Sequence, residues 1–565
     1  MGRTVAIGIQ DFRQLILDNC FYVDKTLFIK DWWESRDSVT LITRPRRFGK
    51  TLTMSMVEQF FCVTQQERSN VFDQLEIWQY ADMREIYGKY PVISLSFANV
   101  KEKSFEMTKK KICELIVQVY INYEYVLEDN VLQETEVSIY KRMINHMDEV
   151  DATLALNHLS RILYKYYGKK VIILLDEYDT PMQEAYIDGY WDELASFMRG
   201  LFNAAFKTNP ALERGLMTGI TRVSKESIFS DLNNLEVITT TSEKYATSFG
   251  FTEKEVLASL EEYGLGNRKE QVKAWYDGFT FGIQKDMYNP WSIINFLDKA
   301  QLNTYWANTS GNRLVSELVQ KSNRDMKQAF EDLLNGKTII CELDEQIVYD
   351  QLYTNENAIW SLMLASGYLK VVSFKGYEDL PEDMAPQYEL AITNYETKRM
   401  FDEMIKGWFA KERTDYNDFI KAMFLGDVAA MNGYMNRIAL EIFSFFDTGK
   451  RASGSQPERF YHGFVLGLLV ELREQYYLRS NRESGFGRYD ILLEPKNRQD
   501  IAVILEFKVR NPGSEKSLEE TVNAALRQIE EMQYQQELLQ RGIQKKQIKC
   551  YGIAFEGKQV LIGKR

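Results

Sequence analysis

The sequence predicts an α/β protein in three parts: a parallel sheet covered by helices, a mostly helical middle region, and a small mixed α/β domain at the C-terminal end. Three observations predict this class. Before about residue 250, unbroken apolar strands alternate with helices, which is typical of parallel sheets buried on both faces. From about 250 to 440, apolar residues have helical spacing. After a Gly/Ser/Lys-rich stretch at 447–458, a helix, two strands, a second helix and two more strands follow.

Length, apolar runs and cysteine content narrow the class of protein. A chain of 565 residues is long enough for about three or four domains, and we place boundaries at 1–250, 251–445 and 446–565. The longest apolar runs, such as VIILL (171–175), are far shorter than the roughly 18 residues of a membrane span, so we expect no membrane partner. The N-terminal residues lack the layout of a signal peptide. Five scattered cysteines without a CxxC pair favour a cytoplasmic location without disulfides or zinc sites.

The charge distribution leaves the partner open. A net charge of −12 does not indicate a nucleic-acid-binding chain. The last 25 residues, however, carry seven Lys/Arg against one Glu. Such a segment is either a solvated pair of strands or a patch that binds a phosphate backbone.

Apolar runs and helical periodicity predict the elements in chain order. In the N-terminal part we expect strands at 36–43, 91–97, 169–179 and 213–223, and helices at 51–62 and 103–127. In the middle region, three segments have helical periodicity: TEKEVLASLEEYG, DMKQAFEDLLNG and NDFIKAMFLGDVAAMNGYMNRIALEIFSFF. In the C-terminal part we expect helices at 458–476 and 517–540, strands at 488–494 and 501–509, and a terminal pair of strands.

A phosphate-binding loop is predicted at RPRRFGKT (44–51), between an expected strand and an expected helix. In such a loop, backbone N–H groups and the helix N-terminus surround the phosphates. The lysine reaches the β- and γ-phosphates, and the hydroxyl holds Mg²⁺. Gly49, Lys50 and Thr51 supply these last three elements.

The first half of this loop departs from the usual pattern. Arg44 stands where the loop normally has its first glycine, and Pro45 makes a turn of its own. Arg46 and Arg47 either surround the triphosphate or lie on the surface as solvated charges, and Phe48 belongs to the same nucleotide-binding stretch.

Acidic and polar residues follow two later strands. One apolar strand ends in Asp176 and Glu177, at the end of an α/β sheet where ligands bind. In a P-loop ATPase the Asp holds Mg²⁺ and the Glu polarises the attacking water. The alternative is that Asp176 only caps the next helix. Thr218, Thr221 and Arg222 lie near the end of the following strand, where a polar sensor of the γ-phosphate is expected.

A second group of charged residues lies in the C-terminal part. Asp490 lies in one apolar strand, and Glu506 and Lys508 follow five apolar residues in the next. Because strand side chains alternate, Glu506 and Lys508 share one face while Phe507 points to the other. Buried charges are costly unless they are paired or bound to metal. The alternatives are a Glu–Lys pair on an edge strand and a metal-dependent catalytic centre.

The N-terminal and middle motifs resemble a predicted AAA-ATPase-like family of bacterial proteins, related to archaeal-type and STAND ATPases. The motifs that carry the resemblance are IGIQDF, FYVDKT (21–26), RPRRFGKT, LLDEYD, TGITRVS, DLNNL, WYDGFTFG (275–282), YNPWSIINFL (288–297), YWANTSGN (305–312) and SGYLKV (366–371). The resemblance implies a P-loop NTPase with an ASCE-type parallel sheet, a helical lid after it, and ATP and Mg²⁺ as ligands. It also implies that Arg44 is a family trait.

The C-terminal part, over roughly 455–565, resembles the PD-(D/E)xK nuclease superfamily through Asp490, Glu506 and Lys508. The resemblance implies a restriction-endonuclease-like fold in which the two acids bind Mg²⁺ and the lysine orients or activates the attacking water. Carboxylates suit this hard cation, which generates hydroxide and neutralises charge on the phosphorus centre.

Other residues of this domain are candidates for supporting roles. Some members of the superfamily place an extra acid on the first helix, so Glu458 is a candidate metal ligand, with His462 on the same helix face. Gln528 resembles the glutamine of a Gln–Tyr motif, but Tyr534 follows six positions later instead of four. Glu483 is a candidate phosphate-side or salt-bridging residue.

Together these motifs predict an ATP-binding and ATP-hydrolysing protein whose nucleotide state gates a Mg²⁺-dependent nuclease. DNA is the expected substrate, in genome defence or control of mobile elements, and self-association is a further expectation. The second hypothesis is a nucleotide-switch protein whose nuclease-like domain binds nucleic acid without cutting it. The third is an ATP-driven motor with the C-terminal domain as a clamp.

Overall fold

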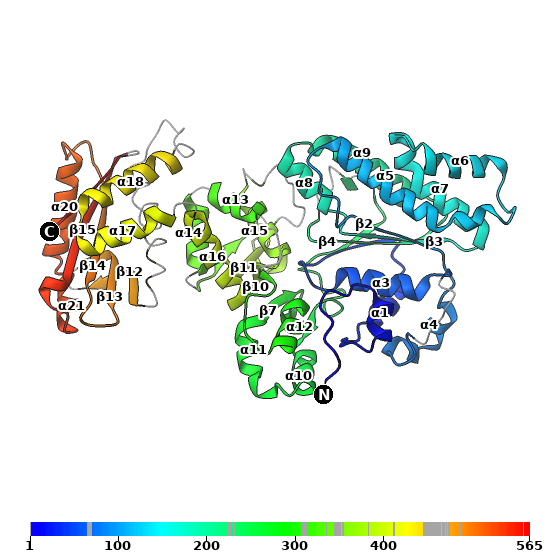
Figure 1. Ribbon diagram of the computed structural model, residues 1–565, viewed down its shortest axis with the longest axis horizontal. Coiled ribbons are helices and arrows are strands. Elements are labelled where there is room, and N and C mark those ends of the chain that lie inside the picture. Colours follow the sequence, from blue (N-terminus) through cyan, green and yellow to red (C-terminus); the bar gives the residue numbers. More distant parts are fainter. Residues whose placement is uncertain are drawn as a thin grey trace. The chain divides into compact units, whose positions relative to one another are not determined.

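The computed structural model describes residues 2–64, 71–222, 228–229, 232–307, 313–321, 324–334, 336–343, 352, 355–381, 384–410, 413–443, 465, 469, 472, 475–484, 487–556 and 559–565 (Figure 1). The chain divides into two compact units. One comprises Met1–Ser322 and Asp332–Met400, and the other comprises Asn323–Glu331 and Phe401–Arg565.

The first unit is built on a parallel sheet with the strand order β2-β3-β4-β1-β5. Its strands are β1 (Val39–Thr43), β2 (Val92–Ser96), β3 (Val171–Asp176), β4 (Leu212–Gly219) and β5 (Leu235–Ile238). β3 is buried at every position, as expected for a strand covered on both faces. β4 separates β1 from β3, and the carboxyl ends of all three meet at one edge. The order confirms the expected ASCE-type sheet.

Helices cover both faces of this sheet (Figure 1). One face carries α1 (Phe12–Leu17), α2 (Leu27–Ser35), α3 (Lys50–Phe61), η1 (Glu76–Gln79) and α4 (Ala81–Ile86). The other helices are α5 (Phe105–Asn122), η2 (Glu124–Leu127), α6 (Glu134–Asn145), α7 (Glu149–Tyr167), α8 (Thr180–Asp188), α9 (Trp191–Phe202) and the π-helical turn η3 (Asn203–Lys207). Successive strand residues point to opposite faces of the sheet. Ile172 and Leu174 therefore pack against the helices of the first face, while the buried side chain of Ile173 points to the other face.

The middle of the chain contains the expected helices and also two small antiparallel sheets. The helices are α10 (Glu253–Glu262), η5 (Gly266–Arg268), α11 (Lys269–Tyr276), α12 (Pro290–Lys299), α13 (Arg313–Lys321), α14 (Arg324–Leu334), α15 (Glu356–Ala365), η8 (Tyr377–Asp379) and α16 (Tyr395–Ala410). The sheets are β6 (Phe251–Thr252), β8 (Gln284–Tyr288) and β7 (Asp277–Phe281), and β10 (Leu369–Lys375), β11 (Gln387–Ile392) and β9 (Ile339–Cys341).

The WYDGFTFG motif, expected in the helical lid, changes from helix to strand after Tyr276. Gly278 explains the change, because its φ of +131° is a conformation that residues with a side chain rarely adopt. A Cβ at this position would also lie 2.1 Å from the carbonyl oxygen of Thr393. Helical periodicity alone does not report such a backbone contact.

The second unit is a mixed sheet with the strand order β12-β13-β14-β15-β16 and helices on both faces. The unit also includes most of α14 and of α16. Its other elements are α17 (Arg413–Leu425), α18 (Val428–Phe443), β12 (Tyr476–Ser484), β13 (Gly487–Pro495), β14 (Ala502–Val509), α20 (Leu518–Glu531), α21 (Gln535–Gln540), η10 (Lys545–Gln547), β15 (Ile548–Glu556) and β16 (Gln559–Lys564). β14 and β15 are parallel, and the other pairs are antiparallel.

Two helices expected in the middle region pack on this sheet. Phe419 and Met423 of α17 and Met431 of α18 share a core with alternate residues of β13, β14 and β15. The opposite face packs against α20 and α21. The segment 413–443 therefore lies in the second unit, although the sequence analysis assigned it to 251–445. Among the helices of the described residues, we find none with both the length and the apolar character to cross a membrane.

Candidate functional sites

The predicted phosphate loop connects the end of β1 to the start of α3. Gly49 has a φ of +83° and directly precedes the helix, so the first backbone N–H groups of α3 face the loop. Lys50 Nζ donates to the carbonyl oxygens of Arg44 and Pro45, at 2.9 Å each. Burial lowers the pKa of Lys50, while the nearby acids, Glu177 foremost, act in the opposite direction. The loop is thus folded around its lysine and ends at a helix N-terminus, an arrangement that suits an anion.

Arg44 is a structural anchor of the loop. Its guanidinium donates to the carbonyl oxygens of Thr43 (2.9 Å) and Thr239 (2.6 Å). It also lies over the ring of Phe281, 4.6 Å from the centroid. The side chain is fully buried, and burial lowers its pKa to about 9. The residue that replaces the usual glycine therefore attaches the loop to the segment after β5.

Residues of the middle region hold the next part of the loop. The carbonyl oxygen of Arg46 accepts hydrogen bonds from Asn289 Nδ2 (3.2 Å) and Trp306 Nε1 (3.0 Å). The guanidinium of Arg47 lies 4.2 Å from the ring centroid of Trp291. Asn289 and Trp306 are site residues that the sequence analysis missed, although they lie in YNPWSIINFL and YWANTSGN. No residue pattern pointed to them, because their partner is a backbone carbonyl oxygen, which every residue has.

The acidic residue of β3 lies directly against the loop helix. Asp176 Oδ2 accepts a hydrogen bond from Thr51 Oγ1 at 2.7 Å, and Oδ1 accepts one from Thr218 Oγ1. Burial raises the pKa of Asp176, and these hydrogen bonds act in the opposite direction. The N-cap of α8 is Asp179 and not Asp176, so the helix-cap alternative is not supported. Thr51 and Asp176 form a pair of oxygen donors suited to Mg²⁺.

Glu177 faces the same cavity, and Thr180 Oγ1 donates to its Oε2 at 3.2 Å. Its φ of +52° turns the chain sharply after β3. The residues expected to sense the γ-phosphate, Thr218, Thr221 and Arg222, are not among those that line this cavity. The Thr221 hydroxyl donates to Asp179 Oδ2 at 2.9 Å.

The cavity at the loop has a volume of about 420 Å³, within the range of small-molecule sites. Its lining includes the loop stretch 46–51, with Phe48, and the ionisable groups Lys25, Arg46, Arg47, Lys50 and Lys101 against Glu177. Lys25 is paired with Glu255, and the other four cations against Glu177 favour an anionic ligand. The lining also has an apolar part, which includes Ile9, Phe21, Val23, Phe251 and Ile294.

The C-terminal centre is assembled from two neighbouring strands. β13 and β14 pair with Ile491 opposite Leu505, so the next step of the same register sets Asp490 opposite Glu506 on one face. Lys508 is two positions further along β14 and shares that face. The backbone N–H of Phe507 donates to Asp490 Oδ2 at 2.8 Å. Glu506 is only 3% exposed.

Gln528 completes this group from helix α20. Its Nε2 donates to Glu506 Oε1 and to the Tyr534 hydroxyl, the latter at 3.3 Å. The six-residue spacing works because α20 ends at Glu531 and Gln533, with a φ of +53°, turns the chain back. The sequence predicted a single helix over 517–540, and this break is what brings Tyr534 to Gln528. The carboxylates of Asp490 and Glu506 are oxygen donors that suit Mg²⁺.

Three further candidates of this domain were Glu458, His462 and Glu483. Glu458 and His462 lie outside the described residues, and Glu483 lies in β12 opposite Arg488 of β13. Within the described ranges, no cluster of three or more His, Cys, Asp or Glu side chains forms a metal site. In the basic C-terminal segment, Lys549 and Lys564 donate to carbonyl oxygens at the end of α17. These two lysines therefore have a structural role.

Comparisons with known proteins match the two regions of the chain that contain these sites. Residues 6–229 match a family model described as predicted AAA-ATPase, and residues 456–565 match that of the PD-(D/E)XK nuclease superfamily. An uncharacterized protein in the vnfD 5′ region of Azotobacter chroococcum mcd 1 is 24% identical over 405 residues, which cover 71% of this chain and 70% of that protein. The chain therefore matches an AAA-ATPase-like family in its N-terminal part and the PD-(D/E)XK nuclease superfamily at its C-terminal end.

Proposed function

We propose that the first unit binds ATP with Mg²⁺ and hydrolyses it. The observation that carries this proposal is the 2.7 Å hydrogen bond between Thr51 and Asp176, which joins the loop helix to the acidic end of β3. Chance matches to Gly-Lys-Thr lack this acidic partner. The surplus of cations around the 420 Å³ cavity supports a polyphosphate ligand.

The residues of the cavity have separable roles in this proposal. Lys50 exchanges its bonds to the Arg44 and Pro45 carbonyl oxygens for phosphate oxygens, and the N-terminus of α3 holds the phosphates. Thr51 and Asp176 would hold Mg²⁺, and the bound ion would neutralise charge on the phosphates. Glu177 orients the water and accepts its proton, and Thr180 fixes the orientation of this carboxylate.

The roles of Lys50 and Glu177 can be tested separately. Lys50→Ala should abolish binding of Mg·ATP, because it removes the buried ammonium that the loop holds against its own carbonyl oxygens. Glu177→Gln should keep binding and reduce hydrolysis by about a hundredfold or more, because a general base acts only in the chemical step. Titration calorimetry and phosphate release measure the two effects. Wild-type protein that binds no nucleotide with Mg²⁺ present contradicts the proposal.

The second unit is, in our proposal, a Mg²⁺-dependent nuclease that cuts DNA. The arrangement of Asp490, Glu506 and Lys508 on one face supports it. The two acids would hold the metal, and a bound Mg²⁺ would supply Lewis acidity to activate water and to stabilise charge at phosphorus. Lys508 orients the attacking water, and Gln528 holds the Glu506 carboxylate in place. The nucleotide state of the first unit gates cleavage.

One experiment separates this function from the alternatives. Wild type, Lys508→Ala and Lys50→Ala are incubated with linear and circular DNA and with RNA, with and without Mg²⁺ and ATP. We expect Mg²⁺-dependent DNA cleavage that Lys508→Ala abolishes and that depends on ATP only when Lys50 is present. DNA binding without cleavage favours the nucleotide-switch alternative, and cleavage indifferent to ATP contradicts gating. Self-association and a role in genome defence or control of mobile elements remain predictions.

A further inference from the structure

The FYVDKT motif (21–26) forms one wall of the nucleotide cavity. Phe21, Tyr22 and Val23 line it, and so does Lys25. The Tyr22 hydroxyl contacts Met56 Sδ at 3.5 Å, which places this wall beside α3. Met56 is six residues after Lys50, or about 9 Å along the helix axis. The wall therefore lies beside α3 away from the phosphate loop, and in the proposed binding of ATP we assign this end of the cavity to the nucleoside.

The motif is fixed on the side that faces the core. Asp24 accepts hydrogen bonds from the backbone N–H of Thr26 (2.9 Å) and from that of Glu76 (2.7 Å). The Thr26 hydroxyl in turn accepts one from the backbone N–H of Ile77 at 3.2 Å. These contacts attach the wall to η1 without involving the opposite side of the cavity.

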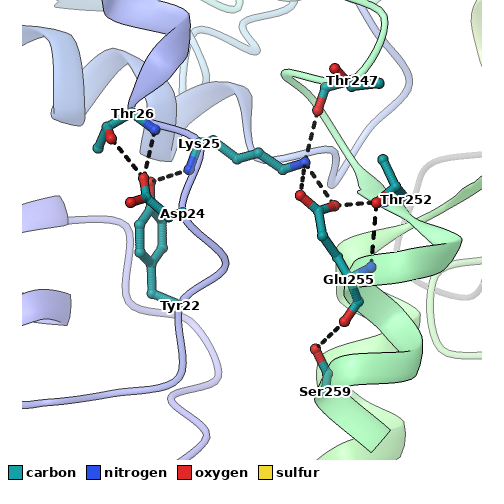
Figure 2. Close-up of polar contacts among 8 residues, drawn as sticks. All are labelled: Tyr22, Asp24, Lys25, Thr26, Thr247, Thr252, Glu255 and Ser259. Carbon is teal, nitrogen blue, oxygen red and sulfur yellow. Dashed lines mark hydrogen bonds and ion pairs between the residues drawn. The ribbon is translucent and has the colours of Figure 1, made fainter. Parts of the chain in front are cut away.

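Lys25 connects this wall to the opposite one, as Figure 2 shows. Its Nζ donates to both carboxylate oxygens of Glu255, at 2.7 and 2.8 Å, and to the carbonyl oxygen of Thr247 at 2.8 Å. Ser248, Gly250 and Phe251, which follow Thr247, line the cavity. The Lys25 and Glu255 side chains are only 14% and 26% exposed, so solvent screens this ion pair weakly.

Glu255 is itself held rigidly. It is the third residue of α10 and forms a capping box, in which the backbone N–H of Thr252 donates to its Oε2 at 2.7 Å. Its charge also lies in the first turn of the helix, where the helix dipole stabilises an anion. A fixed carboxylate therefore sets the position of the Lys25 ammonium, and with it the separation of the two walls.

All three ammonium donors of Lys25 have protein acceptors, so it is not free to bind phosphate. We propose that the Lys25–Glu255 pair is a positioning device that fixes the width of the nucleoside end of the cavity and so sets nucleotide affinity. The inference rests on the proposed binding of ATP. It assigns to Lys25 a different role from that of Lys50, although both line the same cavity.

The chain offers a matched control. Glu136 is also the third residue of its helix, α6, and also combines a capping box with an ion pair, to Lys165 at 2.6 Å. Neither Glu136 nor Lys165 lines the cavity. Lys165→Met therefore removes the same kind of pair and reports its purely structural effect.

The test compares the affinities of Lys25→Met, Glu255→Gln, the double variant and Lys165→Met for Mg·ATP and Mg·ADP by titration calorimetry, with thermal unfolding without nucleotide. Glu255→Gln keeps a side-chain oxygen that can accept the Thr252 N–H of the capping box, so we expect this variant to fold. We expect Lys25→Met and Glu255→Gln each to lower the affinity for both nucleotides on the order of tenfold. The double variant should be no weaker than either single variant, because one pair is broken in all three.

The outcomes distinguish this inference from the proposed function. If Lys25 contacted the γ-phosphate, it would contribute more to the binding of ATP than of ADP. A change in the ratio of the ATP and ADP affinities in Lys25→Met therefore overturns the positioning role. Unchanged affinity of Lys25→Met, with only the lowered unfolding midpoint that Lys165→Met also shows, overturns it as well. Wild-type protein that binds neither nucleotide overturns the proposed function itself.

Discussion

At the level of single residues, Arg44 departs from the usual phosphate-loop motif but still stabilises the loop. A glycine in this position allows a tight turn. Here a buried guanidinium holds the loop in place instead, by donating hydrogen bonds to the carbonyl oxygens of Thr43 and Thr239. The sequence analysis identified the departure, but the partners come from a segment about 195 residues later in the chain.

Restoring the usual glycine should therefore harm the protein. We expect Arg44→Gly to lower the unfolding midpoint by an amount equivalent to roughly 2–3 kcal/mol, because charged hydrogen bonds are lost and buried carbonyl oxygens lose their donors. Arg36→Gly is the matched control. Arg36 is exposed and has a φ of +58°, which glycine adopts readily, so we expect no loss there. Equal unfolding midpoints for Arg44→Gly and wild type would contradict the anchoring role.

A second residue makes stability depend on pH. Glu396 is fully buried and accepts hydrogen bonds from Ser292 Oγ (2.7 Å) and the backbone N–H of Trp306 (2.6 Å), and burial raises its pKa to about 7. The folded state therefore keeps a proton that the unfolded chain releases near pH 4.3. Stability should fall as pH rises from about 4.3 to 7, and this contribution should not change further above 7.

Glu396→Gln removes the ionisable group but keeps an oxygen acceptor. We expect the variant to be more stable than wild type at pH 8 and to lose the part of the pH dependence between about 4.3 and 7. Thermal unfolding across this pH range measures it. A variant with the same pH profile as wild type would show that another group is responsible.

At the scale of elements, helix α18 protects the exposed edge of the C-terminal sheet. Asn432 Nδ2 donates to the carbonyl oxygen of Ile562 at 2.9 Å, and its Oδ1 accepts from the backbone N–H of Ile562 at 2.7 Å. Asn436 makes the same pair of bonds with Val560 at 2.7 and 3.0 Å. The two residues are four apart on one helix face, so they act as a substitute strand beside β16.

Removing these amides should expose the edge. We expect Asn432→Ala/Asn436→Ala to lose about 2–4 kcal/mol of stability, since four hydrogen bonds are broken, and to increase self-association through β16. Thermal unfolding and light scattering measure the two effects. Asn497→Ala, in an exposed turn of the same unit, should show neither. A double variant that stays monomeric and stable contradicts the role of α18.

At the scale of the whole molecule, the two compact units predict two unfolding transitions. The cavity lies wholly in the unit with β1 to β5, so saturating Mg·ATP should raise only one of them. Binding at a hundred times Kd stabilises a site by about 2.7 kcal/mol, enough to resolve the shift by calorimetry. A single transition, or an equal shift of both, would show that the units unfold together.

Sequence patterns alone predict the fold class, the loop with Lys50 and Thr51, the acids Asp176 and Glu177, and the set Asp490, Glu506 and Lys508. These follow from local rules: unbroken apolar strands, strand alternation, and short motifs whose chemistry is carried by neighbouring residues. The same rules gave the start of α3 and the end of β3 to within one to three residues, at Lys50 and Asp176.

The partners of these side chains and of the loop follow from the folded structure and not from the sequence. Asn289 and Trp306 bind a loop carbonyl, Lys25 pairs with Glu255 across the cavity, and Tyr534 reaches Gln528 through a break in a helix. Each contact depends on a backbone group, a turn or a segment far away in the chain. Periodicity reports which face of an element is buried, but it does not report which distant element covers that face.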